Sequence, residues 1–430
     1  MGLAVFVLIA TFIILLLMDV PVAFCIGMAT LVTMVVAVDF VPATSATAQR
    51  IATGLDSFTL LAIPFFILAG NLMGRGGIAR RLIAFALATV GALPGGLALV
   101  NIIACMLFGA ISGSSIAAAA AIGSVMHPKL VENGYAPSFS TAVNVSSATT
   151  GLLIPPSNVL IVYSLASGGV SVAALFIAGY FPGILLGGAL MAVAAFVAHR
   201  KGFGNVARVP LGVVVRRLLD ALPSLALIVV VIGGIVAGIF TATEAAAIAV
   251  LFALVLVLLY REVRFRELPD ILLGSVTTTA VVMLLIGTSL ALSWVLSFEN
   301  IPQNIANALI ALSDNKIVVL LIINVLLLMV GTFMDMTPAI LIFTPIFLPI
   351  VVGLGVDPLH FGILMVANLC IGLCTPPVGT VLFAGAGVAN IPVSRVIRPL
   401  LPFYVAMLIA LMLITFLPEI TLVLPRIFGL

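Results

Sequence analysis

Charged residues make up only 7% of this 430-residue sequence, which contains one tryptophan, three histidines and four cysteines. A soluble domain carries about 25% charged residues, so the composition excludes a chain that folds mainly in water. The histidines and cysteines show no metal-ligand spacing, and Cys370 and Cys374, at i and i+4 in an apolar run, are interpreted as packing residues. The net charge of +3 indicates no nucleic acid partner, because the basic residues lie in short loops.

Long apolar runs make up most of the sequence. Hydrophobic residues make up 64% of the sequence, and the mean hydropathy is +1.43. The runs have the length, about 17 to 25 residues, that crosses a bilayer core about 30 Å thick. The first run, from Leu3 to Met18, has no basic segment and no small-residue cleavage site, so we interpret it as a retained helix. The sequence therefore predicts an all-α polytopic membrane protein with little mass outside the lipid bilayer.

Two of the runs, 96–128 and 317–350, are too long for one crossing and have a polar, glycine-rich middle. We expect each to form a re-entrant hairpin that enters and leaves on the same side of the membrane. The other runs predict about ten crossings, at 2–18, 21–38, 57–73, 139–168, 172–198, 221–240, 242–260, 271–297, 361–390 and 396–417.

Basic residues indicate the orientation. The most basic loops, His199–Arg217 and Arg261–Glu267, belong in the cytoplasm by the positive-inside rule. With ten crossings and two hairpins, both chain ends then lie outside. Fourteen of the seventeen Lys and Arg residues fall inside, and only Arg50, Lys316 and Arg426 fall outside.

The two halves of the chain are related by a shift of 221 residues. The shift superimposes Gly151 on Gly372 and the pair Pro155–Pro156 on Pro376–Pro377, so that GLLIPPSNVL has the counterpart GLCTPPVGTV. In the predicted topology the first hairpin opens to the cytoplasm and the second to the outside. The sequence therefore predicts an inverted repeat.

Each double proline interrupts a helix at membrane depth. Proline removes a backbone N–H donor and leaves carbonyl oxygens without their helical partners. Irregular backbone in a bilayer is tolerated where it is buried in protein or lines an aqueous cavity. Inverted repeats with broken helices are typical of secondary transporters, which bind substrate and ions at the breaks. The alternative is a kink relieved by neighbouring helices; two related breaks favour a site.

Both hairpin tips carry polar residues. The first reads GAISGSSIAAAA and the second VGTFMDMTPAI. The shift superimposes Ser114 on Asp335, which lies deep in an apolar stretch. A carboxylate inside a membrane is costly and marks a functional candidate. The alternative role for Asp335 is to cap the second arm of its hairpin.

The candidate ligands near both breaks are oxygen atoms of Asn, Ser and Thr side chains and of the backbone. Oxygen ligands suit a hard cation, and sodium is the natural choice in a transporter. The alternative is a proton carried by Asp335, but the scarcity of other buried carboxylates and of histidines favours sodium.

Five segments resemble the large membrane subunit of tripartite ATP-independent periplasmic (TRAP) transporters. They are LDSFTLLAIPFFILAGNLM, GAISGSSIA, GLLIPPSNVLIVYSLASG, MDMTPAILIFTPIFLPI and GLCTPPVGTVLF. They are spread over most of the chain, from about residue 50 to residue 405. The resemblance implies a transport protein and not an enzyme.

The resemblance further implies a multi-pass protein of a bacterial inner membrane, with the elevator-type fold of the ion transporter superfamily. It implies import of an organic acid (a C4-dicarboxylate, sialic acid or another sugar acid) by symport with sodium, at two or more sodium sites. Two partners are implied: a small four-helix membrane subunit and a periplasmic binding protein that delivers the substrate. The hairpins and broken helices would slide as a transport unit against a static scaffold.

The same resemblance divides the chain into scaffold, arms and transport unit. The implied parts are N-terminal scaffold helices (1–56), a scaffold helix and arm (57–95), the first hairpin and broken helix (96–168), scaffold helices and cytoplasmic loops (169–300), a second arm (301–316), the second hairpin and broken helix (317–390) and a C-terminal helix (391–430).

Site residues are implied as well. For the substrate they are Ser114, Ser115, Ser157, Asn158 and Asp335. A substrate carboxylate would repel Asp335, so we expect this residue to meet a hydroxyl, an amine or sodium, which favours a polyhydroxylated acid. For sodium the implied residues are Ser112, Asn144, Gly151 and Pro155 in the first half and Gly331, Thr332, Asn368, Thr375 and Gly379 in the second.

Three other functions fit parts of the pattern. A stand-alone sodium-coupled symporter for divalent carboxylates also uses two re-entrant hairpins, but it needs no binding protein. An intramembrane serine hydrolase would pair Ser112 with a histidine, whereas His127 lies near a membrane boundary. A channel would need no inverted pair of gates.

Overall fold

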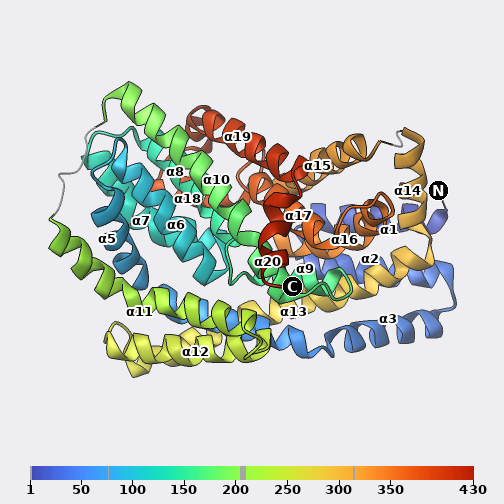
Figure 1. The fold of residues 1–430 in the computed structure, drawn as a ribbon. Helices are drawn as coiled ribbons and strands as arrows, with labels where there is room; N and C mark the ends of the chain where they lie inside the picture. The colour runs from blue at the N-terminus through green and yellow to red at the C-terminus, as the bar shows by residue number, and fades with distance from the viewer. Residues whose placement is uncertain (1, 76, 204–209, 313–314) are drawn as a thin grey trace.

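The computed structural model describes residues 2–75, 77–203, 210–312 and 315–430, and within these ranges the protein is helical, without a strand (Figure 1). Eight of the described helices are long and apolar enough to cross a membrane. Residues 204–209 of the predicted cytoplasmic loop and 313–314 of the predicted second arm lie outside the described residues.

Each predicted apolar run has a helical counterpart. Outside the repeat, the elements are α1 (Leu3–Leu17), α2 (Val22–Ala37), α3 (Phe40–Leu55), η1 (Phe58–Leu61), α4 (Ala62–Arg75), α5 (Ile78–Val90), α10 (Val172–Lys201), α11 (Leu211–Val236), α12 (Ala242–Leu259), η3 (Phe265–Glu267), α13 (Leu268–Phe298), α14 (Ile301–Leu312), α19 (Val393–Phe416) and α20 (Glu419–Ile427).

The repeat predicted from the shift of 221 residues is confirmed by the helix bounds. The shift carries α7 onto α16 end for end, and it carries α9 onto α18 to within two residues. The first unit consists of α6 (Gly96–Ser112), α7 (Ser115–Glu132), α8 (Pro137–Ala148), η2 (Thr150–Leu152) and α9 (Asn158–Ala166), and the second of α15 (Lys316–Phe333), α16 (Met336–Gly353), α17 (Pro358–Gly372) and α18 (Thr380–Ala389).

Both predicted hairpins are present as helix pairs joined by two residues. Gly113 and Ser114 connect α6 to α7, and Met334 and Asp335 connect α15 to α16. Gly113 has a φ of 63°, a left-handed conformation that glycine adopts without steric cost, so the chain reverses sharply at this tip. Both double prolines lie between helices, as predicted, and the peptide bond within each pair is cis.

The two broken helices meet at the centre of the repeat. The Cys370 Sγ–H donates to the carbonyl oxygen of Thr149 at 3.1 Å, and Thr149 is the residue that the shift superimposes on Cys370. Contact between equivalent residues is what a two-fold relation between the two units produces. Cys370 and Cys374 are buried free thiols, as expected of packing residues.

Paired glycines bring each hairpin against its own broken helix. A Cβ atom added to Gly151 would lie 2.6 Å from Gly109 Cα, and one added to Gly372 would lie 2.6 Å from Gly331 Cα. Small residues let helix backbones approach closely inside a membrane, where van der Waals packing drives association. Each hairpin therefore rests directly on the backbone next to its break.

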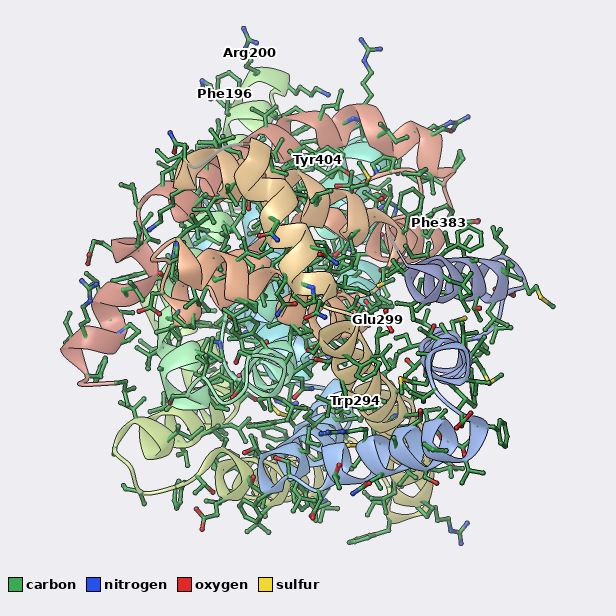
Figure 2. The ribbon with its side chains drawn as sticks, turned by 90° about the vertical axis from the view of Figure 1, so that its right-hand side faces the viewer. Phe196, Arg200, Trp294, Glu299, Phe383 and Tyr404 are labelled. Carbon is green, nitrogen blue, oxygen red and sulfur yellow. The ribbon has the colours of Figure 1, made fainter. Side chains whose placement is uncertain are left out.

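The basic residues gather at one end of the molecule. In Figure 1, α5, the end of α10 and the beginning of α11 lie at the left, whereas the N-terminus and α14 lie at the right. Figure 2 views the molecule from its right-hand side and shows Trp294 beside α3, where the Arg50 guanidinium lies 5.2 Å from the Trp294 ring centroid. Arg50 is one of the three basic residues predicted to lie outside.

Candidate functional site

A cavity of about 510 Å³ lies between the two hairpin tips and two of the outer helices, α4 and α13. Its volume falls in the range of small-molecule sites, about 300–1,000 Å³. The repeat lines it with Ser112, Gly113, Ser114, Ala117, Phe108, Asn158, Val159, Val162, Asp335 and Thr337. We call this space the tip cavity.

Three helices begin at the tip cavity. Ser114 precedes α7, Asn158 is the first residue of α9, and Asp335 precedes α16. Helix N-termini carry unsatisfied N–H groups and about half a positive charge, so they attract anions. Ser114 Oγ accepts the N–H of Ala117 at 3.2 Å and satisfies one of these donors. The arrangement suits a ligand with a negative charge and neighbouring polar groups.

Asp335 occupies the N-cap position of α16 without making a side-chain capping hydrogen bond. Its side chain is exposed and lines the cavity. Ser114, its counterpart in the first unit, does cap its helix. The Asp335 carboxylate thus differs from Ser114 in its capping geometry and faces the cavity at the start of α16.

The structure brings three of the five residues predicted for the substrate to one place. Ser114, Asn158 and Asp335 line the cavity, and the first tip touches α9, since a Cβ atom on Gly113 would lie 2.7 Å from Asn158 Nδ2. Ser115 and Ser157 are buried and are not among the lining residues. The Ser157 hydroxyl donates to the carbonyl oxygen of Leu152 at 2.5 Å.

The residues predicted for sodium in the first unit have separate surroundings. Ser112 lines the tip cavity, and Gly151 rests on Gly109. Asn144 lies between the hairpin arms, where its Nδ2 donates to the carbonyl oxygen of Ala119 at 2.8 Å. Pro155 is buried in the break. Among the hydrogen bonds of the described residues, none joins these four to one another.

The predicted residues of the second unit are closer together. The N–H of Gly379 donates to the carbonyl oxygen of Thr332 at 2.9 Å, across the gap between hairpin and broken helix. A Cβ atom on Gly379 would lie 2.8 Å from the carbonyl oxygen of Thr375. Gly331 touches Gly372 one residue before Thr332. Backbone oxygens of Thr332 and Thr375 thus face the same glycine.

Each unit also holds a buried amide oxygen without a partner: that of Asn368 on α17, one turn before its break, and that of Asn101 on the hairpin arm α6. Asn368 Nδ2 donates to Asn324 Oδ1 at 2.6 Å, while Asn368 Oδ1 is buried and unpaired. In the first unit, Asn101 Nδ2 donates to Ser147, the counterpart of Asn368, at 3.1 Å, and Asn101 Oδ1 is likewise unpaired. Unpaired buried oxygens are costly, so these two are available to a cation.

Sequence reasoning missed Asn101, although it is a lone amide in an apolar hairpin arm. It also missed the opposite wall of the cavity, to which α4 contributes Asn71 and Arg75 and α13 contributes Asp270 and Thr278. Asn71 Nδ2 donates to Ser275 Oγ at 2.9 Å and joins these two helices. The residues of α4 and α13 line the cavity because distant parts of the chain pack together, and a local sequence pattern does not predict such packing.

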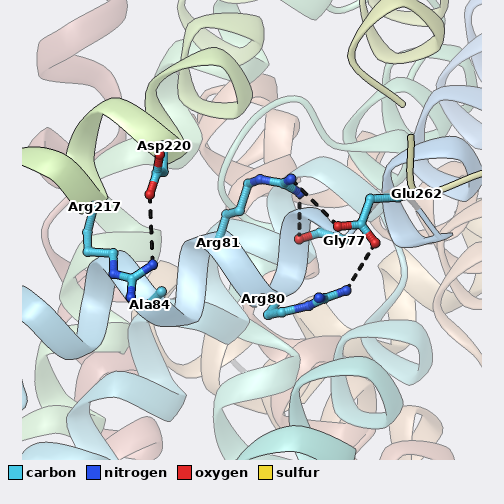
Figure 3. Close-up of a pocket in the computed structure, with 7 residues that line it drawn as sticks. All are labelled: Gly77, Arg80, Arg81, Ala84, Arg217, Asp220 and Glu262. Carbon is cyan, nitrogen blue, oxygen red and sulfur yellow. Dashed lines mark hydrogen bonds and ion pairs between the residues drawn. The ribbon is translucent and has the colours of Figure 1, made fainter. Parts of the chain in front are cut away.

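A second pocket, of about 280 Å³, lies at the basic end of the molecule (Figure 3). Arg80 and Arg81 on α5 both reach Glu262, at 3.1 and 3.6 Å, and Arg217 lies 3.8 Å from Asp220. Glu262 joins α5 to the segment between α12 and α13, and Asp220 pairs with Arg217 within α11. Each charged side chain of the pocket thus has a partner within the protein, and the three arginines and two carboxylates leave one net positive charge. The pocket is therefore better explained as a structural link than as a ligand site.

Replacing Glu262 by alanine should remove both ion pairs with α5. Partly exposed ion pairs contribute about 0–1 kcal/mol each, so we expect a loss of stability of about 1 kcal/mol and transport within about threefold of the unaltered protein. Thermal unfolding in detergent and uptake by vesicles measure the two effects. A complete loss of transport would show that the link takes part in the cycle.

The histidines lie away from the tip cavity. His127 follows the start of α7 by twelve residues, about 18 Å along the helix, and its Nδ1 is 3.1 Å from Ser140 Oγ. His360 Nδ1 is 2.8 Å from Thr421 Oγ1. No histidine, His199 at the end of α10 included, is among the described residues that line the tip cavity with Ser112, so none is placed to act as the base that the serine hydrolase alternative needs.

Comparison with known proteins agrees with this geometry. The family described as "Tripartite ATP-independent periplasmic transporter, DctM component" matches residues 9–420. YgiK of Salmonella typhimurium is 54% identical over 99% of this chain and 98% of its own length. The C4-dicarboxylate TRAP transporter large permease protein DctM of Pseudomonas aeruginosa is 44% identical over 87% of this chain and 88% of its own. The isethionate TRAP transporter permease protein DctMQ of Oleidesulfovibrio alaskensis is 43% identical over 96% of this chain, which spans 65% of that protein.

The fold also has a counterpart among solved structures. The YdaH transporter of Alcanivorax borkumensis superimposes with a TM-score of 0.61, over 86% of this chain and 87% of that one. The two sequences are 15% identical, so the likeness concerns the fold.

Proposed function

This chain belongs to the DctM component family of tripartite ATP-independent periplasmic transporters, and from this premise we propose that it imports an organic acid in symport with sodium. It is a large permease component with multiple membrane-crossing helices, and it is not an enzyme. The observation that carries the proposal is the tip cavity, where three helix N-termini and both hairpin tips meet.

The cavity supports an anionic substrate with hydroxyl or amine groups. Helix N-termini favour the anionic group, and Ser114 and Asn158 supply polar partners. Asp335 in the same wall favours a donor group or a sodium ion. C4-dicarboxylates, sugar acids such as sialic acid, and isethionate are the candidates that the relatives and the residues suggest.

Sodium is proposed to bind between each hairpin and its broken helix. The unpaired oxygen of Asn368 and the backbone near Thr332, Thr375 and Gly379 support one site. The unpaired oxygen of Asn101, near Ser147, supports an equivalent site in the first unit. Oxygen donors without partners are the ligands that a hard cation requires. Because both hairpin tips line the tip cavity, sodium binding at the hairpins would couple the sodium gradient to substrate binding in that cavity.

Alternating access is proposed to occur by an elevator motion of the repeat against the outer helices. One wall of the tip cavity belongs to the repeat and the other to α4 and α13, so relative sliding would carry the substrate. The contact is close, because a Cβ atom on Gly70 of α4 would lie 2.9 Å from the carbonyl oxygen of Ser112. Rigid-body motion of one part of a transporter against another is the usual basis of alternating access.

The orientation and partners complete the proposal. The basic end that holds α5 would face the cytoplasm of a bacterial cell. By the predicted number of crossings, both termini would then lie on the periplasmic side. A small four-helix membrane subunit and a periplasmic binding protein would act with this chain. The stand-alone symporter is the alternative that differs in needing no binding protein.

Uptake by proteoliposomes tests the proposal. The vesicles would contain this chain with the proposed small membrane subunit and periplasmic binding protein from the same bacterium, and would be offered radiolabelled succinate, N-acetylneuraminate or isethionate. We expect uptake of one acid that requires both an inward sodium gradient and the binding protein. Uptake without the binding protein would favour the stand-alone symporter. Uptake at the same rate with and without a sodium gradient would contradict symport with sodium.

A further inference from the structure

The tip cavity has one positively charged side chain among its described lining residues, and it lies on the wall opposite the hairpins. Arg75 stands in the last turn of α4 and is exposed. Asp270, in the first turn of α13, is the acidic residue on that wall among the described lining residues. Among the ion pairs of the described residues, neither takes part in one, so the guanidinium is available to a ligand.

Arg75 marks one end of the cavity. The α4 residues that line it run from Ile63 to Arg75, a distance of about 18 Å along the helix. Arg75 is followed by α5, whose Arg80 and Arg81 lie at the basic end of the molecule. The cavity therefore extends from the hairpin tips toward the end that is proposed to be cytoplasmic.

We propose that Arg75 binds the anionic group of the substrate while the cavity faces the cytoplasm, and so selects for oxyanions and controls release. This inference rests on the proposed function and extends it to the outer wall. Arginine presents two parallel N–H donors that fit a carboxylate, and a sulfonate offers similar oxygens. In a substrate that carries a hydroxyl or amine group, that group then lies toward Asp335, which removes the repulsion that two carboxylates would experience.

The interaction between Arg75 and the substrate is specific to the state in which the cavity faces the cytoplasm. Arg75 belongs to α4, whereas Ser114, Asn158 and Asp335 belong to the repeat. When the repeat moves relative to α4, the latter three residues travel with the substrate and Arg75 does not. Loss of Arg75 should therefore weaken binding from the cytoplasmic side and leave delivery from the binding protein unaltered.

The first experiment compares Arg75→Gln with Arg75→Lys and with Arg266→Gln. The last removes a positive charge at the same end of the molecule, from a residue outside the cavity lining. Proteoliposomes are loaded with the acid that the unaltered protein carries, out of succinate, N-acetylneuraminate and isethionate, and exchange is measured against the concentration at the cytoplasmic side. We expect Arg75→Gln to raise the half-maximal concentration about tenfold or more, Arg75→Lys about threefold, and Arg266→Gln to leave it unaltered.

An equal concentration dependence for Arg75→Gln and the unaltered protein would overturn the inference and leave the proposed function standing. Equal effects of all three variants would overturn it too, since a general field at that end would then explain them. Failure of the unaltered protein to carry any of the three acids would overturn the proposed function and the inference with it.

A second experiment tests the position without relying on transport. The four native cysteines are buried, so Arg75→Cys introduces the accessible thiol. A membrane-impermeant maleimide should label Arg75→Cys from the cytoplasmic side, and the transported acid should slow the labelling at least about threefold if it occupies the cavity. Labelling from the periplasmic side alone, or labelling that the acid leaves unaltered, would contradict the proposal.

Discussion

Replacement of Gly151 by alanine is expected to lower stability by about 1–3 kcal/mol and to reduce transport about tenfold or more, because the added methyl group enters the backbone of the first hairpin. Its Cβ would lie 2.6 Å from Gly109 Cα, 2.8 Å from the Gly109 carbonyl carbon and 2.9 Å from the Ala110 nitrogen. These are backbone atoms, so the hairpin arm itself must move. The same change at Gly372 should act on the second hairpin through Gly331.

The control is Gly188→Ala in α10, where an added Cβ would meet nothing within 4 Å. Alanine is a better helix former than glycine by about 1 kcal/mol, so this variant should be as stable as the unaltered protein or more so. Thermal unfolding in detergent and uptake in proteoliposomes give the two readouts. Normal stability and transport in Gly151→Ala would contradict the direct contact between hairpin and broken helix.

The second large effect is expected from Asp335→Asn. This change keeps the size of the side chain and removes the one acidic group that the second hairpin presents to the tip cavity. A charge-assisted hydrogen bond contributes about 1.5–3 kcal/mol, so we expect transport to fall about tenfold to hundredfold while membrane insertion is unaffected. Sodium-driven uptake at several substrate concentrations measures the loss.

Asp220→Asn is the matched control for this prediction. Asp220 is half-exposed, pairs with Arg217 at 3.8 Å and lies outside the tip cavity. Its replacement should leave uptake within about twofold, since exposed ion pairs contribute little. If both Asp→Asn variants carry substrate at the normal rate, Asp335 has no part in the site.

The sequence was sufficient to predict the elements whose pattern is local. Apolar runs located the crossings, and the coincidence of Gly151 with Gly372 and of the double prolines located both breaks. Helices that lie along the surface were harder to predict, because α3 and α5 are amphipathic and their sequences resemble loops between apolar runs. The positions of the hairpins and their relation by the repeat thus followed from the residues, whereas the helices between them did not.

Within the site, single residues could not be assigned from the sequence. Ser114 and Ser115 are adjacent, but Ser114 is the N-cap of α7 with extended backbone and Ser115 is its first helical residue, so that one lines the cavity and the other is buried. Arg75 carried no local signal beyond its place among the basic residues, because the residues of the repeat that share the cavity with it are distant in the chain, Asn158 by more than eighty residues. Packing between α4 and the repeat decides which side chains share the site.

The most direct test of the account is a cryo-electron microscopy map of the chain with its membrane partner, sodium and the transported acid. The account predicts density for the acid in the tip cavity, bounded by Ser114, Asn158 and Asp335, with its anionic group toward Arg75. Density for the acid outside this cavity, for example in the pocket between Arg80 and Arg217, would contradict it.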